Sequence, residues 1–381
     1  MVRVNPFNPQ LPSRPEFFVG RELEIIEFEK FLNQTINNSP MNMAINGNRG
    51  MGKTSLLKKF EQMAKDRKCL VLQFSEYSDN KLFLQFSDFL LVNLKQEIES
   101  RGIVSTLKSE LEEILNSIRV NYGDVKIYLE IQKKAPELLK KGLIKSWEGI
   151  SKDYSAVVLL FDEAEFLEVN DLLKPLRNIF QDISEKANYI IVLSGKLNFP
   201  LRMSESYSPL NRFFPASTLN PLKQTEIEEY VIKKLETRNI KITQRALKGI
   251  VTKTEGHPYI VVEMCYTLFD SLRDDEEIID DNVISRTNDK LKAKLAQNFF
   301  SPMYNTLPEG AKPIIRKLAQ NDKIEFSPKD AIKITGINGS GLSPYLGELE
   351  RRGILNKPQR AQYRFFHTLF LDFLKDLGKQ V

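Results

Sequence analysis

Residues 41–65, MNMAINGNRGMGKTSLLKKFEQMAK, decide the fold. Inside this stretch, residues 47–54 read GNRGMGKT and match the pattern GxxxxGK[ST] at every fixed position. An apolar run at 41–46 predicts a short buried strand before the motif, and residues 55–65 favour a helix after it. This motif forms a phosphate-binding loop when it lies between a strand and a helix. A chance glycine-rich turn would not account for both flanking elements.

Each part of this loop suits a polyanion. The glycines allow backbone N–H groups to curve around phosphate oxygens, and the following helix adds the partial positive charge of its N-terminus. Lys53 is predicted to reach the outer phosphates, and the Thr54 hydroxyl is predicted to bind Mg²⁺. The predicted nucleotide contacts in this segment are Gly47, Asn48, Arg49, Gly50, Met51, Gly52, Lys53, Thr54 and Ser55.

A second apolar run supplies two carboxylates. Residues 157–161, VVLLF, are typical of a central parallel strand, and Asp162 and Glu163 follow directly. Ligands of open α/β sheets bind at the carboxyl ends of the strands. We therefore predict that Asp162 holds Mg²⁺ and that Glu163 polarises the attacking water as general base. Such a pair without a phosphate loop would more often be the start of a helix.

A third apolar run, NYIIVLS at 188–194, ends in Ser194. A polar residue at the tip of a strand next to the phosphate loop could orient water or touch the γ-phosphate. An ordinary strand-ending serine is the alternative interpretation, and the sequence leaves both open.

The order of the predicted elements indicates an α/β protein. Buried strands alternate with helices up to about residue 218, which predicts a parallel sheet between helical layers. Residues 82–150 look largely helical, and helices are expected at 225–237, 243–253, 258–271 and 280–296. The predicted domains are an extended, proline-rich arm at 1–15, an ATPase core at 16–218, a helical lid at 219–300 and a winged-helix domain at 301–381.

The composition excludes several classes of protein. The 381 residues carry 55 Lys or Arg and 50 Asp or Glu, so the net charge of +5 is too small to argue for nucleic acid. Two His and two Cys argue against an imidazole or thiolate metal site, and Cys69 and Cys265 lie in apolar runs typical of core thiols. Neither a signal peptide nor a stretch of about 18 apolar residues is present, so we expect a cytoplasmic protein.

Several short segments carry a resemblance to a known family. In chain order they are FVGRE at 18–22, the phosphate loop, VVLLFDE at 157–163, the Ser194 strand end, SPLNR at 208–212, LNPL at 219–222 and EGHPY at 255–259. Together they resemble the archaeal AAA+ ATPases of the STAND-like group, which are related to archaeal initiator and origin-recognition ATPases. The likeness covers about residues 16–270, and the C-terminal part more loosely. It implies a P-loop AAA+ core of the ASCE type, a helical lid, a C-terminal winged helix, and ATP used with Mg²⁺ as a slow conformational switch.

The resemblance implies further site residues. The FVGRE segment lies against the adenine in that family, and the GxP element of the lid packs on the base. The positions that match are Phe18, Val19, Gly20, Gly256, His257 and Pro258. Arg212 matches an arginine that often serves the γ-phosphate of a neighbouring subunit, which would make the protein a homo-oligomer. Without the family, His257 is a plain loop histidine and Arg212 a surface arginine.

The sequence departs from standard members of the family in two ways. Ser194 stands where Asn is usual, and the lid has no clear arginine near its GxP element. Both departures leave the rate of hydrolysis open.

The last eighty residues predict a winged helix-turn-helix, with helices at 308–319, 328–334 and 340–352 and an extended pair at 354–355 and 363–366. Between 340 and 364, five Lys or Arg (Arg351, Arg352, Lys357, Arg360 and Arg364) and two Glu give a net charge of +3. This excess could meet the phosphates of double-stranded DNA. The helix lacks early Asn, Gln or Arg to read bases, and winged helices on such ATPases also serve as protein-interaction or autoinhibitory modules. Three hypotheses therefore stand: an ATP-driven switch, a DNA-binding initiator or regulator, and a STAND-type signalling or defence scaffold.

Overall fold

The computed structural model describes residues 3–74, 83–100, 105–119 and 125–379, except for the side chains of 105–107, 125–132 and 379. The described chain divides into two compact units, and the phosphate loop contributes to both. Unit 1 contains residues 1–20, 48–52 and 220–381, and unit 2 contains residues 21–47 and 53–219.

Unit 2 is built on a five-stranded sheet in the order β2-β3-β4-β1-β5, with every strand pairing parallel. All residues of β1, β3 and β4 are buried, so both faces of the central sheet are covered. The predicted α/β class with a parallel sheet is therefore confirmed. The strands are β1 (Met43–Asn46), β2 (Leu70–Phe74), β3 (Val157–Phe161), β4 (Tyr189–Gly195) and β5 (Ala216–Thr218).

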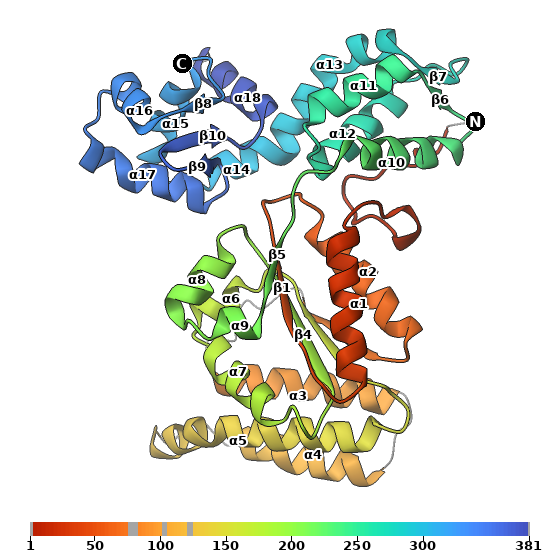
Figure 1. Cartoon of the computed structure of the whole chain (residues 1–381), viewed down its shortest axis with the longest axis vertical. Coiled ribbons are helices and arrows are strands. Elements are labelled where there is room, and N and C mark those ends of the chain that lie inside the picture. The colour runs from red at the N-terminus through yellow and green to blue at the C-terminus, as the bar shows by residue number, and fades with distance from the viewer. Residues whose placement is uncertain (1–2, 75–82, 101–104, 120–124, 380–381) are drawn as a thin grey trace. The chain divides into compact units, whose positions relative to one another are not determined.

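Helices lie on both sides of this sheet (Figure 1). On one side, Phe28 of α1 and Phe60 of α2 are fully buried and stack with ring centroids 4.1 Å apart. Such a pair contributes about 0.5–1.5 kcal/mol beyond its buried area. The helices of this layer and of the opposite side are α1 (Glu22–Ile36), α2 (Lys53–Asp66), α6 (Glu165–Val169), α7 (Leu173–Asp182), α8 (Phe199–Ser206) and α9 (Leu210–Phe213).

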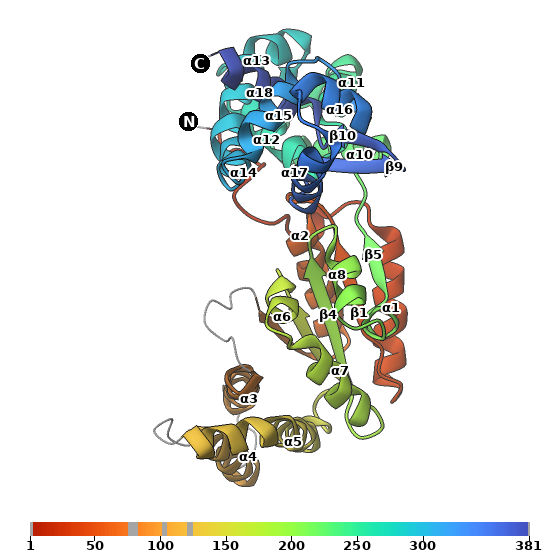
Figure 2. The ribbon, with the colours of Figure 1, turned by 90° about the vertical axis from the view of Figure 1, so that its left-hand side faces the viewer.

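Three helices between β2 and β3 form a helical group of their own (Figures 1 and 2). They are α3 (Phe83–Ser100), α4 (Ser105–Ile118) and α5 (Val125–Ile150), which confirms the helical interpretation of 82–150 for the described residues. Each helix packs on the other two, and α5 also contacts α7. A Cβ atom on Gly142 of α5 would lie 2.6 Å from Leu91 of α3, so a glycine permits the close approach of these helices.

In unit 1, the N-terminal segment and four long helices share one apolar core. Phe7 is buried in this core, and Asn5 donates to Tyr266 O at 2.9 Å, so the proline-rich segment is held along the helices. The elements are the 3-10 turn η1 (Pro15–Phe17), α10 (Gln224–Glu236), β6 (Lys241–Ile242), α11 (Gln244–Thr254), α12 (Pro258–Phe269), β7 (Ile278–Ile279) and α13 (Asp281–Leu295).

The remainder of unit 1, residues 301–381, is called here the C-terminal module. It follows a π-helical turn, η2 (Ala296–Phe300), and contains a three-stranded antiparallel sheet in the order β8-β10-β9. Its elements are α14 (Ser301–Asn305), α15 (Ala311–Ala319), β8 (Glu325–Phe326), α16 (Pro328–Thr335), α17 (Gly339–Arg351), β9 (Leu355–Gln359), β10 (Gln362–Phe365) and α18 (Thr368–Lys379).

Several short elements were not expected from the sequence. β5, β6, β7 and β8 have two or three residues each, too few to give a periodic pattern. The expected strand at 354–355 is the longer β9, whose outer residues are polar and exposed and so lack an apolar signal. Cys69 and Cys265 are buried free thiols, as predicted, and burial raises the pKa of both, that of Cys69 to about 11. Among the described residues, no helix is long and apolar enough to cross a membrane.

Candidate nucleotide-binding site

The site begins at the edge of the sheet where β1, β3 and β4 end. Because the strands are parallel, their carboxyl ends meet at one edge. Gly47 follows β1, Asp162 follows β3, and Ser194 is the penultimate residue of β4. Since β4 lies between β1 and β3, Ser194 lies between the start of the phosphate loop and the carboxylates.

Asp162 is the centre of the hydrogen bonds at this edge. Its Oδ2 accepts from the Thr54 hydroxyl at 2.5 Å, and its Oδ1 accepts from the Ser194 hydroxyl at 2.8 Å and from the Glu163 amide at 3.0 Å. Only 7% of Asp162 is exposed, and Ser194 is fully buried. The structure therefore brings together three residues predicted from separate parts of the chain. A hydroxyl and a carboxylate that converge on one point are the hard oxygen ligands that suit Mg²⁺.

Lys53 is folded back over the start of its own loop. Its Nζ donates to Gly47 O at 2.9 Å. Burial lowers the pKa of Lys53, and the carboxylates of Glu165, Asp162 and Glu163 act in the opposite direction, in that order of strength. Lys196 is a further neighbour whose charge lowers this pKa. Lys53 thus lies among the acidic residues at this edge of the sheet. A lysine that contacts phosphates bound to a metal ion needs such a position.

Glu163 has an uncommon backbone conformation. Its φ of +51° is in the left-handed region, which residues other than glycine rarely adopt. The Glu163 amide donates to Asp162 Oδ1 at 3.0 Å in this conformation, and the Glu163 residue itself is exposed. Strained backbone that is fixed by its surroundings tends to occur at functional positions. The left-handed backbone of Glu163 fits a residue whose carboxylate points away from the end of β3.

Residues 48–52 of the loop contact other segments of unit 1. Arg49 O lies 3.1 Å from His257 Nε2, and Gly50 O accepts from the Tyr259 amide at 3.2 Å. Asn48 Nδ2 donates to Asn356 Oδ1 at 3.1 Å. A Cβ atom on Gly50, whose φ is +78°, would lie 2.7 Å from the imidazole, so no larger residue fits here. Two predicted groups, the loop and residues 256–258, are therefore adjacent within unit 1.

His257 is held as a neutral imidazole. Burial lowers the pKa of His257 to about 3, and the nearby His367 contributes to this shift. The pKa of His367 is also lowered, again chiefly by burial. A neutral imidazole that donates from Nε2 to Arg49 O keeps Nδ1 as an acceptor. Gly256 beside it has φ +75°, and a Cβ atom there would lie 2.4 Å from Leu222 O.

The remaining predicted site residues lie elsewhere. Phe18, Val19 and Gly20 follow η1 in unit 1, and Val19 packs on the core of that unit. The φ of Gly20 is +70°, and a Cβ atom there would lie 2.8 Å from the Glu226 carboxyl carbon. Arg212 is an exposed residue of the short helix α9 in unit 2.

Sequence reasoning missed three residues at the edge of the sheet. Glu165 Oε1 accepts from the Lys196 amide at 2.5 Å, and Asn46 Nδ2 donates to Leu197 O at 3.0 Å. Glu165 is also the strongest charged neighbour of Lys53. The only sequence signal for Glu165 and Lys196 is their closeness to predicted site residues. Glu165 is two residues beyond Glu163, and Lys196 is two residues beyond Ser194.

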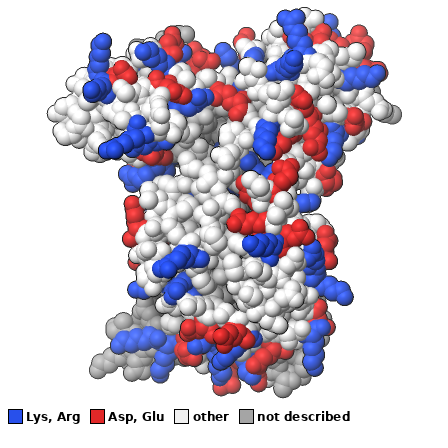
Figure 3. All heavy atoms as spheres, in the orientation of Figure 1, with Lys and Arg blue, Asp and Glu red and all other residues white. Residues whose placement is uncertain are grey.

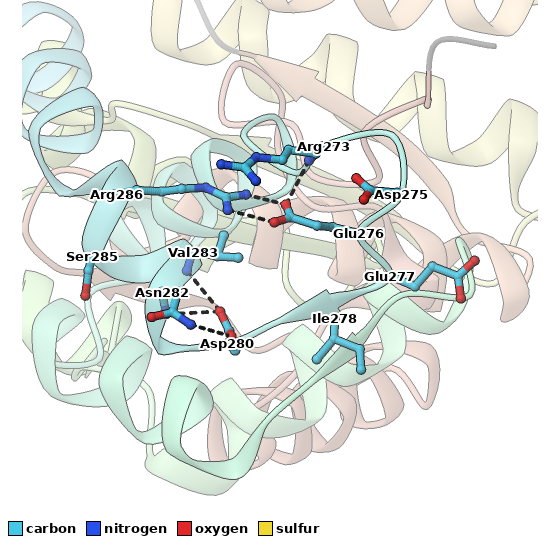
Figure 4. Close-up of a pocket in the computed structure, with 10 residues that line it drawn as sticks. All are labelled: Arg273, Asp275, Glu276, Glu277, Ile278, Asp280, Asn282, Val283, Ser285 and Arg286. Atoms are coloured by element: carbon cyan, nitrogen blue, oxygen red, sulfur yellow. Dashed lines mark hydrogen bonds and ion pairs between the residues drawn. The ribbon is translucent and has the colours of Figure 1, made fainter.

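A separate open hollow of about 790 Å³ lies in unit 1 around the start of α13 (Figure 4). Several of its charged side chains are engaged in local contacts. Glu276 accepts from Arg286 and from the Arg273 amide, and these contacts lower the pKa of Glu276 to about 2. Asp280 caps α13 by accepting from the Asn282 and Val283 amides at 3.0 Å. Glu276 and Asp280 therefore have structural roles within this part of unit 1.

The basic residues of the C-terminal module are partly engaged within unit 1. Arg364 pairs with Glu255 at 2.9 Å and with Glu325 at 3.0 Å. Arg351 and Arg352 both pair with Glu348. Lys357 and Arg360 are exposed, and the Lys357 ammonium lies 5.6 Å from the Tyr363 ring centroid. On the face in Figure 3, basic and acidic side chains are interspersed rather than separated.

Comparison with known proteins gives one family match and one relative of known sequence. Residues 36–203 match the family model of an AAA domain. An uncharacterised HTH-type transcriptional regulator of Methanocaldococcus jannaschii is 24% identical over 339 residues, which are 84% of this chain and 79% of that protein.

Two solved structures are also similar. The Walker-type ATPase of Pyrococcus abyssi aligns with a TM-score of 0.58 and 15% identity over 98% of this chain and 99% of that one. The Orc1 protein of Aeropyrum pernix, solved in complex with DNA, aligns with a TM-score of 0.51 and 14% identity over 98% of this chain and 97% of that one. The parallel sheet, the phosphate loop and these similarities together show that the chain has the fold of an AAA P-loop ATPase.

Proposed function

We propose that the protein binds ATP with Mg²⁺ and hydrolyses it slowly, as a conformational switch. The observation that carries this proposal is the convergence of Thr54, Asp162 and Ser194 beside Lys53, at the end of a complete phosphate-loop motif. The AAA domain match over residues 36–203 supports it.

Different residues would bind the phosphates, hold the metal ion and accept the proton of the attacking water. The backbone of residues 47–52 and Lys53 would bind the phosphates, and Thr54 and Asp162 would hold Mg²⁺, which neutralises charge on the phosphate oxygens. Asp162 keeps its orientation through the Ser194 hydroxyl. Glu163 would take a proton from the attacking water. Its exposed side chain on a left-handed backbone is free to turn towards that water.

Other residues would contact the adenine base and the neighbouring subunit. We propose Phe18, Val19, Gly20, Gly256, His257 and Pro258 as adenine contacts, and Ser55 as a further contact beside Thr54. The burial of His257 against Arg49 O supports a fixed position for this group. Arg212 is proposed to act in trans in a homo-oligomer, since it is exposed on a short helix that follows β4.

Substitution of Lys53 tests the nucleotide site directly. Lys53→Ala removes a charge-assisted contact from a site built for a polyanion, so equilibrium binding of a fluorescent ATP analogue should be abolished. Lys59→Ala, on the same helix but outside the motif, is the control and should bind normally. Equal affinity for Lys53→Ala and wild type would refute the proposed site.

We further propose the domain division given by the sequence, with an arm at 1–15, a core at 16–218, a lid at 219–300 and a winged helix at 301–381. The order of elements in the C-terminal module supports the last of these: α15, β8, α16, α17 and the hairpin β9–β10. Nucleotide-dependent movement of this module is the proposed output of the switch.

Double-stranded DNA is the partner that the similar proteins favour. One is an HTH-type transcriptional regulator by name, and another was solved in complex with DNA. We propose residues 340–364 as the contact, with Lys357 and Arg360 on the backbone phosphates. Fluorescence anisotropy with labelled duplexes at several salt concentrations tests this. Lys357→Glu with Arg360→Glu should weaken binding for every sequence and flatten its salt dependence.

A protein-facing role for this module is the second candidate. It is favoured by the pairing of Arg364 with Glu255 of the preceding helical region, and by the hydrogen bond between Thr368 N and the same carboxylate at 3.0 Å. On this reading, as in a STAND-type scaffold, wild type ignores DNA at low salt with and without ATP. That result in the anisotropy experiment would end the DNA proposal.

A further inference from the structure

Two carbonyl groups of the phosphate loop are held by the start of α12, within unit 1. Arg49 O lies 3.1 Å from His257 Nε2, and Gly50 O accepts from the Tyr259 amide at 3.2 Å. A carbonyl oxygen cannot donate, so the imidazole is the donor of the first contact. A phosphate loop binds its anion through inward-pointing backbone N–H groups. The carbonyls that α12 holds are therefore not the groups that would contact phosphate.

These contacts satisfy polar groups on both segments. Pro258 is the first residue of α12, and the first amides of a helix have no acceptor within the helix itself. Gly50 O supplies an acceptor for one of them, the Tyr259 amide. In return, two successive carbonyls of the loop gain donors, which backbone groups away from water require. The start of the helix and the loop thus complete each other.

Both donors are fixed in position by packing. Only 5% of His257 is exposed, and its ring centroid lies 5.5 Å from that of Phe299, on which Tyr259 stacks at 4.5 Å. These three residues surround Gly50, because a Cβ atom there would lie within 3.3 Å of each of them. Phe299 belongs to the π-helical turn η2, and such turns are frequent at functional sites. The loop therefore meets a preorganised surface.

We propose that His257 is a positioning residue of the phosphate loop, which sets the affinity for phosphates whatever base they carry. A loop that is already ordered binds without a further loss of conformational entropy. Without the His257 contact, only a fraction of the chains would hold the loop ready, and the affinity for every phosphate ligand would fall by that same factor. The inference rests on the proposed function, and it leaves contact with adenine to Gly256 and Pro258.

Hydrogen exchange of the free protein tests the contact itself. His257→Phe keeps a ring but has no donor for Arg49 O, whereas His257→Gln carries an amide N–H that can replace Nε2. The Tyr259 amide reports on the loop because its acceptor is Gly50 O. One neutral hydrogen bond corresponds to roughly three- to tenfold, so this amide should exchange faster by such a factor in His257→Phe. Exchange close to wild type is expected in His257→Gln, and an unchanged rate in His257→Phe would overturn the proposal.

Binding of ATP, GTP and inorganic tripolyphosphate, each with Mg²⁺, separates positioning of the loop from contact with the base. Competition against a fluorescent ATP analogue measures the three affinities. His257→Phe should weaken all of them by one common factor of roughly three- to tenfold, and His257→Gln should restore most of the loss. A loss confined to ATP would show that His257 contacts adenine instead. Unchanged affinities would show that phosphate binding does not depend on this residue.

Thr267→Val is the matched control. The fully buried Thr267 hydroxyl donates to Glu263 O at 2.8 Å further along the same helix, so this variant also loses one hydrogen bond to a backbone carbonyl. It should leave the exchange of the Tyr259 amide and all three affinities as in wild type, and thermal unfolding confirms that each variant is folded. A wild-type protein that binds no ATP would refute the proposed function, whereas the exchange result concerns only the His257 contact, so the two failures are distinguishable.

Discussion

Ser194→Ala is the change that best tests how the metal site is organised. The Ser194 hydroxyl donates to Asp162 Oδ1 at 2.8 Å from a fully buried position. In the variant this oxygen keeps only the Glu163 amide, and water cannot fully replace the lost donor because Asp162 is 7% exposed. A hydrogen bond to a charged group is worth about 1.5–3 kcal/mol, which corresponds to roughly 10- to 150-fold in an equilibrium constant.

The expected effect is on the metal. If Ser194 acts by positioning Asp162, the Mg²⁺ concentration that gives half-maximal hydrolysis should rise by about tenfold or more in Ser194→Ala. Binding of ATP without Mg²⁺ should change little. Mg²⁺ titrations of phosphate release and of fluorescent-nucleotide binding measure the two quantities separately. Ser194→Thr keeps the hydroxyl and should restore part of the metal affinity in any variant that folds.

Ser217→Ala provides the matched control. Its hydroxyl also donates to a carboxylate, Glu27 Oε2 at 2.5 Å, but from β5 at the far edge of the sheet. This variant should keep the Mg²⁺ requirement of wild type. A folded Ser194→Ala with an unchanged Mg²⁺ requirement would contradict the positioning role. If it also lost ATP affinity without metal, Ser194 would instead touch the phosphate.

Three further predictions concern other parts of the site. Glu163→Gln should keep ATP affinity but slow single-turnover phosphate release by about 10²–10⁴-fold, and a rate equal to wild type would exclude Glu163 as the base. Mixing Arg212→Ala with Glu163→Gln chains should restore activity if sites are shared between subunits; no restoration from a chain that is monomeric at all ATP concentrations would count against Arg212. The pKa values of His257 and His367 are lowered on folding, so the unfolded chain binds more protons below pH 6.5 and stability should fall as the pH drops from about 6.5 towards 5. Urea unfolding should show a loss approaching about 1.4 kcal/mol per pH unit from His257, to which His367 adds in the same direction, and the loss should be smaller in His257→Gln.

The sequence was sufficient to locate residues that are neighbours along the chain. The phosphate-loop residues are consecutive, so a motif captures them and implies the flanking strand and helix. Asp162 was also predictable, because an apolar run followed by a carboxylate marks the end of a buried strand. Its hydrogen bond to Thr54 spans 108 positions, but each residue carries its own local signal.

The partners of Ser194 and Lys196 were not predictable, because they depend on strand order. Local patterns show that β1, β3 and β4 are buried strands, but not that β4 lies between the other two. That order alone brings the Ser194 hydroxyl to Asp162 and Lys196 beside Gly47. Glu165 was missed for a similar reason, since its contact to the Lys196 amide joins residues that follow different strands.

The C-terminal module shows how a charge count from sequence can mislead. Residues 340–364 carry +3, but Arg364 lies between Glu255 and Glu325 inside unit 1. Arg364→Glu should therefore destabilise unit 1 by repulsion between carboxylates, whether or not the protein binds DNA. Only Lys357 and Arg360 of the hairpin remain exposed for phosphates. Since each phosphate contact adds about 0.9 to the slope of log affinity against log salt, reversal of these two residues should reduce the slope by about two. A reduction near three on additional reversal of Arg364, with the fold intact, would show that the Arg364 ion pairs open when DNA binds.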